Sequence, residues 1–420
     1  MQMNRRFFLH KGALAVAGTA VIPSFLVRSV MAEAAAANPG RRLVVVFQRG
    51  AADGLNIVVP YREKNYYSMR PSIAIPQNQV LDLDGFFGLH PSLAAFKPLY
   101  DQGHLAIVHA AGSPDTTRSH FDAQDYMESG TPGVKSTQDG WLNRALQAED
   151  LRHRCAGTCE QHTAFRALAL GADVPRTLAG KIPAIALSNV NGFTVAGRGP
   201  VPSAAASAFE AMYADSGDRI FHAAGDETFD AVKMLRAANP AQYAPAAGVN
   251  YPASEFGNNM KQIAQLLKAN LGVEAAFTDV SGWDTHQNQG SVNGQLANRL
   301  SDFSSSIAAF WLDLGDDAAN VTLVTMSEFG RTAHENGTGG TDHGHANAMF
   351  VLGGDVKGGK VYGRWPGLDN DQLNEGRDLV LTTDFRQVLG EVVSQTLGAN
   401  NLEMVFPGAS LTPSRFLRLV

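Results

Sequence analysis

Residues Val321–Asn347 read VTLVTMSEFGRTAHENGTGGTDHGHAN, and this stretch decides how the chain is interpreted. It begins with the apolar run Val321–Thr325, which predicts a buried strand. It continues as a glycine-rich loop whose polar side chains are Glu328, Arg331, His334, Asp342, His343 and His345. Because a parallel sheet presents its functional groups where its strands end, this loop predicts a metal or catalytic site.

The composition is that of a globular protein. Of the 420 residues, 45% are hydrophobic and 18% are charged, which allows one large α/β domain or two smaller ones. The formal net charge is -6, so we do not expect a broad surface for nucleic acid.

The first 34 residues have the pattern of a targeting segment. Arg5 and Arg6 precede an apolar run over residues 12–27, which is short for a membrane span. Residues 32–34 provide a small-x-small cleavage site. We therefore expect a twin-arginine signal peptide over 1–34, with the twin-arginine export machinery as a partner. The mature protein would then be periplasmic or secreted, with no permanent membrane span; the alternative is a buried N-terminal helix.

Two cysteines, Cys155 and Cys159, lie between His153 and His162. In an exported protein a local disulfide is the first expectation. A zinc site made of the two cysteines and the two histidines is the alternative. Neither interpretation indicates catalysis in this segment.

Three other predicted strands also end in polar side chains. The strands are residues 41–47, 105–109 and 272–277, and the groups that follow them are Asp53, Thr117 to Ser119, and Asp284 with His286. Strand ends gather at one edge of a mainly parallel sheet, so we expect these groups to lie near the 321–347 loop. Together they predict one shared site.

Each of these segments also has a structural alternative. Asp53 suits a turn, and Ser119 or Thr117 suits a helix N-cap. The functional interpretation of the hydroxyls is a nucleophile at a helix N-terminus, where free N–H groups stabilise an anion. Asp284 and His286 point to the same side of an extended loop, which suits two ligands of one ion or ordinary surface polarity.

The alternation of predicted strands and helices indicates an α/β fold with a mainly parallel sheet and helices on both faces. This domain is expected to span residues 41–420. Within it, the Ala-rich region 150–255 is interpreted as a cap or insertion.

Carboxylates mixed with imidazoles suit a divalent metal, and Zn²⁺, Mn²⁺ and Ca²⁺ are the candidates. The predicted ligands are Asp53, Asp284, His286, Glu328, Asp342, His343 and His345. Seven ligands exceed one tetrahedral site, which favours two ions about 4 Å apart over one. Arg49, Arg118 or Arg331 would pair with a substrate oxyanion.

The order of these segments resembles the alkaline phosphatase superfamily, which includes sulfatases and cofactor-independent phosphoglycerate mutases. In that superfamily an Asp follows the first strand, a Ser or Thr nucleophile opens a later helix, and a late strand leads into a metal-binding loop. More closely, the mature chain resembles the exported, largely uncharacterised family called domain of unknown function 1501. The matching stretches are residues 47–60, 119–130, 282–286, 327–332 and 340–344. These resemblances imply an alkaline phosphatase-like fold and supply no substrate.

The chain departs from the superfamily at two points. Asp284 and His286 are separated by one residue instead of three, and Glu328 stands where the superfamily has an Asp-His pair. Asp342 and His343 are candidates to restore that pair. The departures leave open a one-metal site, a different ester chemistry or a loss of catalysis.

Residues and resemblance together predict an exported metal-dependent hydrolase of a small anionic substrate, a phosphate or sulfate ester. Ser119 would be the nucleophile, with Thr117 in reserve, and Arg331 or Arg118 would stabilise the oxyanion. The alternative is a non-catalytic periplasmic binding or assembly protein on the same fold.

Overall fold

A computed structural model of the chain describes residues 40–155, 162–190, 234 and 242–420. The predicted signal peptide over 1–34 and Cys159 lie outside the described residues. So does most of the predicted cap; the part that is described contributes two strands to the main sheet, β6 (Ala167–Leu170) and β7 (Ile185–Leu187). Among the described helices, none combines the length and apolar character that crossing a membrane requires.

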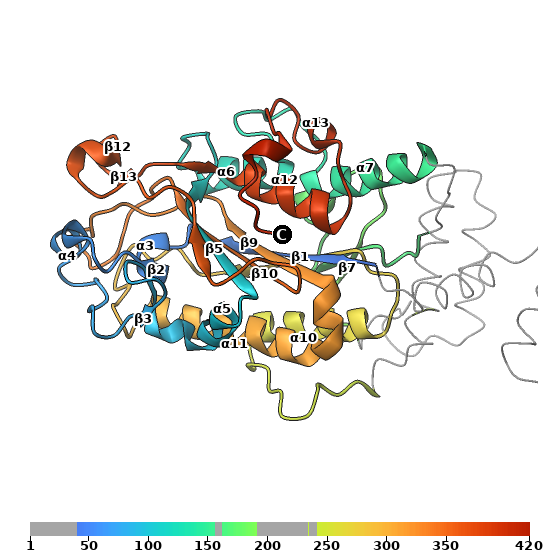
Figure 1. Cartoon of the computed structure of the whole chain (residues 1–420), viewed down its shortest axis with the longest axis horizontal. Coiled ribbons are helices and arrows are strands. Elements are labelled where there is room, and N and C mark those ends of the chain that lie inside the picture. Colours follow the sequence, from blue (N-terminus) through green and yellow to red (C-terminus); the bar gives the residue numbers. More distant parts are fainter. Residues whose placement is uncertain (1–39, 156–161, 191–233, 235–241) are drawn as a thin grey trace, which may run out of the picture.

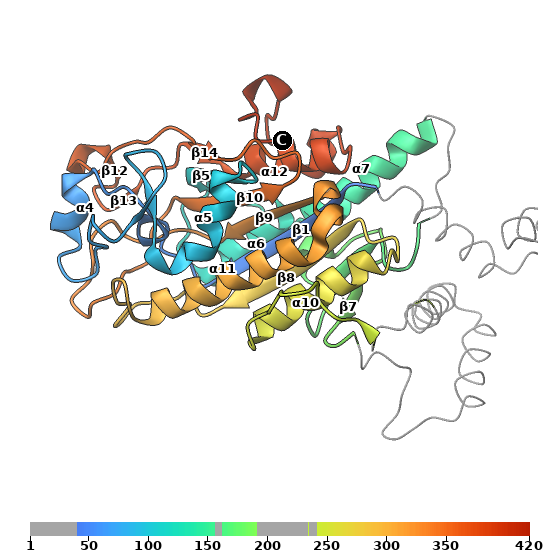
Figure 2. The same ribbon diagram turned by 60° about the horizontal axis from the view of Figure 1, so that its bottom comes forward.

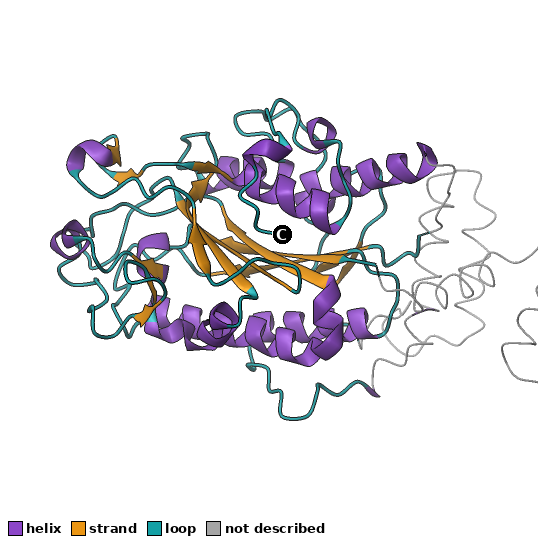
Figure 3. Cartoon of the chain, viewed as in Figure 1, coloured by secondary structure: helices purple, strands orange, loops and turns teal. Residues whose placement is uncertain are grey.

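One nine-stranded sheet forms the centre of the described fold (Figure 1 and Figure 3). Its order is β11-β5-β10-β9-β1-β8-β6-β7, and β14 also pairs with β5. The remaining strands of this sheet are β1 (Arg42–Arg49), β5 (Leu105–Gly112), β8 (Ala275–Ser281), β9 (Val321–Ser327), β10 (Asn347–Gly353), β11 (Lys360–Tyr362) and β14 (Thr383–Asp384). The continuous apolar run of β1 fits its place at the centre, where both of its faces are buried.

The pairings of this sheet are parallel except for those of β10, which runs antiparallel to β5 and β9. The prediction of an α/β fold with a mainly parallel sheet is therefore confirmed. β10 reverses direction because residues 328–346 form a loop that returns to the edge it left, without a crossover helix. Both ends of this loop are thus fixed to the same edge of the sheet.

Helices cover both faces of the sheet, as predicted (Figure 1 and Figure 2). On one face lie the 3-10 helix η1 (Pro91–Phe96), α5 (Lys97–Asp101), α10 (Glu255–Lys268) and α11 (Gln295–Leu314). On the other face lie α6 (His120–Ser129), α7 (Trp141–Cys155), α12 (Phe385–Thr396) and α13 (Leu402–Val405). The short elements beyond these layers are α3 (Gly54–Ile57), α4 (Lys64–Met69), β2 (Val58–Val59), β3 (Leu81–Asp82), β4 (Gly88–Leu89), η2 (Arg176–Leu178), η4 (Gly315–Asn320), η5 (Asn370–Gln372), β12 (Leu373–Asn374), β13 (Asp378–Leu379) and η6 (Pro413–Arg415).

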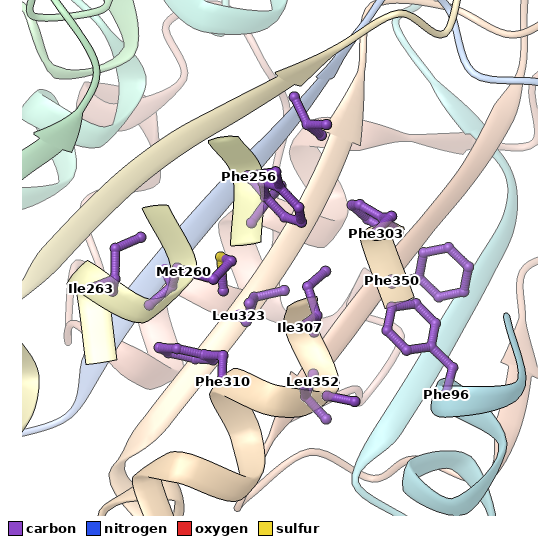
Figure 4. Packing of buried hydrophobic residues seen from close by; sticks show 14 of the residues in the cluster. Phe96, Phe256, Met260, Ile263, Phe303, Ile307, Phe310, Leu323, Phe350 and Leu352 are labelled. Carbon is purple, nitrogen blue, oxygen red and sulfur yellow. The ribbon is translucent and has the colours of Figure 1, made fainter. Parts of the chain in front are cut away.

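The core beneath α10 and α11 follows from helical spacing. Apolar residues three or four positions apart line one side of α11, and they are Leu296, Leu300, Phe303, Ile307, Phe310 and Leu314. Phe96 packs edge-on against Phe303 at 5.8 Å and against Phe350 at 5.2 Å between ring centroids (Figure 4). Aromatic contacts of this kind join η1, α11 and β10 into one rigid layer.

Candidate metal centre

The candidate site lies where β1, β8 and β9 end. Their pairing is in register, so that Arg49 lies opposite Ser281 and Gln48 lies opposite Ser327. The three strands therefore finish level, and the loops that follow them meet one another and the first turn of α6. This is why residues far apart in the sequence come together here.

Three imidazole rings converge at this edge. His343 Nε2 lies 3.0 Å from His120 Nε2 and 2.9 Å from His286 Nε2. The carboxylate of Asp284 lies beside them, with Oδ1 3.1 Å from His286 Nε2 and 3.5 Å from His343 Nε2. Its Oδ2 lies 3.7 Å from His120 Nε2. The ligand atoms of His120, Asp284 and His343 lie within 4.8 Å of one another, and His286 lies beside His343 and Asp284.

The opposite nitrogen of each ring has an acceptor as its partner. His120 Nδ1 lies 2.9 Å from Glu328 Oε1, and His286 Nδ1 lies 3.1 Å from Asp342 Oδ1. His343 Nδ1 lies 2.9 Å from the carbonyl oxygen of Arg118. Since an acceptor at Nδ1 requires the proton there, each Nε2 is left with its lone pair. Lone pairs that face one another at about 3 Å repel unless a proton or a cation lies between them.

These residues fit a divalent transition metal. Around one ion with bonds of about 2.0–2.1 Å, tetrahedral ligands lie about 3.3 Å apart, and the distances among His120, Asp284 and His343, from 3.0 to 3.7 Å, are close to that value. A ligating histidine also usually donates its other N–H to a carboxylate or a backbone carbonyl, which describes all three rings here.

Glu328 holds the ring of His120 in place. Its buried carboxylate also accepts hydrogen bonds from Gln124 Nε2 and from the backbone N–H of Gly50, at 2.9 and 2.8 Å. Burial alone raises the pKa of Glu328, but the hydrogen bonds from His120 and Gln124 outweigh burial and lower it. The carboxylate is therefore charged at neutral pH. The structure places this predicted ligand behind His120 rather than beside the converging nitrogens.

Arg331 has a similar supporting position beneath Asp284. Its buried guanidinium donates to Asp284 Oδ1 at 2.6 Å and to the carbonyl oxygens of Gly50, Ala51 and Thr341 at 2.6–3.0 Å. Burial raises the pKa of Asp284, whereas the hydrogen bond and charge of Arg331 lower it, and the lowering prevails. Arg331, predicted to face an oxyanion, has no exposed side-chain surface.

The other two arginines considered for an oxyanion also lie in ion pairs. The partners are Asp279 and Glu128 for Arg49, and Glu375 and Asp378 for Arg118. The Arg118 side chain keeps 26% of its surface exposed, which is more than the buried Arg331.

The predicted nucleophiles lie at the start of α6. Ser119 is the N-cap of this helix, and its Oγ accepts a hydrogen bond from the backbone N–H of Asp122 at 3.5 Å. Thr117 Oγ1 accepts from the backbone N–H of Ser119 at 3.3 Å. Both hydroxyls are partly exposed and precede His120 by one and three residues. Ser119 therefore caps the helix, as the structural alternative expected. Because it also lies next to the candidate ligand His120, its role as a nucleophile stays a prediction.

Four of the seven predicted ligands are not brought to the converging nitrogens. Asp53 is buried in a two-point ion pair with Arg70 at 2.6 and 2.9 Å, and it also accepts a hydrogen bond from Gln289. His345 Nε2 lies 2.9 Å from the carbonyl oxygen of Ser113. The structure therefore gathers Asp284, His286 and His343 at one point and places Glu328 and Asp342 behind the rings. This arrangement suits one ion.

His120 is the candidate ligand that sequence reasoning missed. The sequence interpretation of the segment before α6 centred on Ser119. The position of His120 beside Ser119, between a strand and a helix, was the available signal, because the ends of β8 and β9 supply the remaining groups. No sequence spacing links His120 to Glu328, its partner 208 residues away.

Among the described residues, one further group has metal-ligand side chains within reach of one another: Glu149, Asp150 and His162. Arg166 occupies its centre, with ion pairs to Glu149, Asp150 and Glu274 at 2.6–2.8 Å. This cluster is an ion-pair network around a guanidinium. Cys159, the predicted partner of Cys155, is outside the described residues.

The site and sheet belong to an α/β protein with a candidate metal centre at the strand ends. The chain belongs to the family described as "Protein of unknown function (DUF1501)", whose pattern matches residues 89–401. Comparison with curated proteins finds no match.

Solved structures with some similarity include the zinc complex of the C-terminal periplasmic domain of EcEptC from Escherichia coli. That pair has 9% identity and a TM-score of 0.34, over 75% of this chain and 73% of the other. Alkaline phosphatase PafA has 11% identity and a TM-score of 0.31, over 70% of this chain and 64% of PafA. A PafA mutant gives 10% identity and a TM-score of 0.32 with the same coverage.

Proposed function

We propose that this chain binds one divalent metal ion at His120, Asp284 and His343, with His286 beside His343, and hydrolyses a phosphate or sulfate ester there. The supporting observation is that the ligand atoms of His120, Asp284 and His343 lie within 4.8 Å of one another, while the Nδ1 proton of each neighbouring imidazole is engaged elsewhere. Imidazole donors favour Zn²⁺ or Mn²⁺ over Ca²⁺, which prefers oxygen ligands.

In this proposal the residues around the ion have separate roles. When bound, a divalent ion supplies Lewis acidity, which polarises an ester oxygen and makes a nearby hydroxyl more acidic. Ser119 is the proposed nucleophile, with Thr117 in reserve, because it adjoins His120 at the helix N-terminus. Asp284, oriented by Arg331 and 45% exposed, faces the reacting groups. Arg118, which is partly exposed, is the guanidinium proposed to approach the ester oxyanion.

We also propose that the protein works outside the cytoplasm, after twin-arginine export in the folded, metal-loaded state. The Arg5-Arg6 pair and the apolar run that follows support this location. Protein exported through its own N-terminal segment should carry metal and should start after Ala34, which N-terminal sequencing and elemental analysis would measure.

The function is tested on the purified full chain. Elemental analysis should find about one Zn²⁺ or Mn²⁺ per chain, and aryl phosphates and aryl sulfates should be hydrolysed when Zn²⁺, Mn²⁺ or Ca²⁺ is restored after chelation. His343→Ala should lose both metal and turnover. A protein that binds no divalent ion, and whose stability chelation does not change, rejects the proposal.

One observation favours a second candidate, a binding or assembly protein with a structural ion. Asp284 lies within 3.1–3.7 Å of all three Nε2 atoms. If His286 joins His120, Asp284 and His343 as a ligand, the ion has four protein ligands, which is typical of structural sites. Full metal occupancy with no turnover of any ester tested would support this function.

A further inference from the structure

The two loops that carry His286 and His343 are joined by one buried side chain, that of Gln289. Its Oε1 accepts hydrogen bonds from Thr285 Oγ1 at 2.7 Å and from Thr341 Oγ1 at 3.1 Å. Thr285 stands between Asp284 and His286, and Thr341 stands two residues before His343. A single amide oxygen therefore holds both ligand-bearing loops.

The other end of the same amide is anchored below the site. Gln289 Nε2 donates to Asp53 Oδ2 at 2.7 Å, and Asp53 pairs with Arg70. Arg70 also donates to the carbonyl oxygens of Thr332 and Ala333 at 2.8 and 2.9 Å. The network thus returns to the loop that carries His343. All of these side chains that exchange hydrogen bonds are buried, so water does not compete with the network.

The backbones of the two loops are also in direct contact. The N–H of Thr341 donates to the carbonyl oxygen of Thr285 at 3.2 Å. A Cβ at Gly340 would lie only 2.3 Å from the carbonyl carbon of His286, so only glycine fits there. The loops pack without a gap, and a change in the polar network beneath them would move one ligand relative to the other.

We infer that Gln289 is a positioning residue of the metal centre, which sets the separation of His286 and His343 through Thr285 and Thr341. The inference rests on the proposed metal function and extends it to a residue that touches no ion. Ligands carried on loops depend on such support, and loss of an outer-shell partner typically weakens metal affinity by about 10–100-fold.

A residue that only stabilises the fold would lower the melting temperature and leave the affinity of the folded site unchanged. A positioning residue would also change the affinity and the coordination geometry. The measurements are therefore the Zn²⁺ dissociation constant, by competition with a chelator, and the Co²⁺ absorption spectrum, both on the purified full chain. The variants are Gln289→Leu and Thr341→Val, and the matched control is Gln287→Leu, an exposed residue of the same loop.

We expect Gln289→Leu to weaken Zn²⁺ binding by about 10–100-fold and to change the Co²⁺ spectrum. Thr341→Val should act in the same direction with a smaller effect, because the bond from Thr285 to Gln289 remains. Gln287→Leu should match the unsubstituted chain.

An unchanged Zn²⁺ dissociation constant and Co²⁺ spectrum in folded Gln289→Leu would overturn the inference, even if this variant melts at a lower temperature. If Gln289→Leu does not fold, Thr341→Val decides by the same two measurements. Failure of the unsubstituted chain to bind Zn²⁺ or Co²⁺ would instead overturn the proposed function, so the two failures are distinguishable.

Discussion

His120 and His343 face each other through their Nε2 atoms at 3.0 Å, although one ring opens α6 and the other lies in the loop between β9 and β10. The Nδ1 of each ring is bound to an acceptor. The contact is favourable only when positive charge lies between the rings. A bound cation would supply this charge, so the His120–His343 pair is the feature that most clearly indicates a metal site.

Removing His120 should abolish metal binding. His120→Ala deletes one of three converging nitrogens, and we expect Zn²⁺ affinity to fall by more than about 100-fold, beyond the usual effect of an outer-shell change. The measurement is metal content after dialysis. His345→Ala is the matched control, because His345 is bonded to the Ser113 carbonyl outside the cluster, and it should keep its ion. Equal metal content in the two variants would contradict this assignment.

Glu328 should act on the metal through His120. Glu328→Gln keeps the shape of the side chain but removes the charge that holds the Nδ1 proton, so Zn²⁺ affinity should fall by about 10–100-fold. Competition with a chelator measures it. Glu375→Gln, at an exposed carboxylate that pairs with Arg118, provides the control and should have little effect. A normal affinity in Glu328→Gln would show that the carboxylate does not tune the ring.

Ser119 has a capping role and a proposed catalytic role, which two substitutions separate. Ser119→Ala loses both, and it should cost about 1 kcal/mol of stability. Ser119→Asn caps a helix about as well as serine but is no nucleophile. We expect both variants to keep metal and to lose ester turnover. If Ser119→Asn is as active as the unsubstituted chain, the hydroxyl serves only the helix.

Asp53 should matter for stability rather than as a ligand. Asp53→Asn leaves the buried Arg70 without its counter-charge, and breaking a buried pair in this way typically costs about 3–5 kcal/mol. The asparagine oxygen still accepts from Gln289, so the metal content should stay at one ion per chain. Denaturant unfolding and elemental analysis test this. Asp101→Asn, in the exposed pair with Lys97, should cost less than about 1 kcal/mol. Loss of metal in Asp53→Asn would restore Asp53 as a ligand.

The metal-free protein should lose stability as pH falls from about 6.5 to about 4. Burial lowers the pKa of His109 to about 4, so within this range the unfolded chain binds a proton that the folded chain does not. The expected loss is about 3 kcal/mol. Denaturant unfolding at a series of pH values measures it.

The control for that titration is His109→Gln. Glutamine can replace both hydrogen bonds of the ring, to the carbonyl oxygen of Val58 and from the N–H of Ala110, without titrating. The pH dependence should then shrink. Burial also lowers the pKa of His343, and this residual dependence should have the same sign. An unchanged slope in His109→Gln would assign the proton to another group.

Local patterns were enough to predict much of the fold. Apolar residues recur at helical spacing over residues 296–314, and α11 covers this stretch from one residue earlier; the strand expected over 321–325 begins β9 at the same residue. These elements bury apolar residues at regular spacing. Residues 91–101 form η1 followed by α5 rather than one helix, because Pro98 lacks the N–H that a continuous helix needs.

A site residue could be predicted from the sequence only where it follows the end of a predicted strand. Asp284, His286 and His343 follow strand ends, and parallel pairing alone brings them together. Asp53 also follows a strand end, but it forms a buried ion pair with Arg70, and no sequence pattern predicts that pairing. His120 was not predicted as a ligand, because Glu328 and His343, the partners that make it a candidate, are more than 200 residues away in the chain.

The central position of β1 has a consequence for how the protein is made. Its Leu43 pairs with Ala275 on one side and with Thr322 on the other. During synthesis this apolar strand emerges early, has no neighbour until residue 281 has been made, and lacks β9 until the ribosome has passed residue 327. Pairings so distant in sequence close slowly, and an unpaired apolar strand is prone to aggregate. Shielding of residues 42–49 until β8 and β9 have been made, for example by a chaperone that binds extended apolar segments, would therefore favour folding over aggregation.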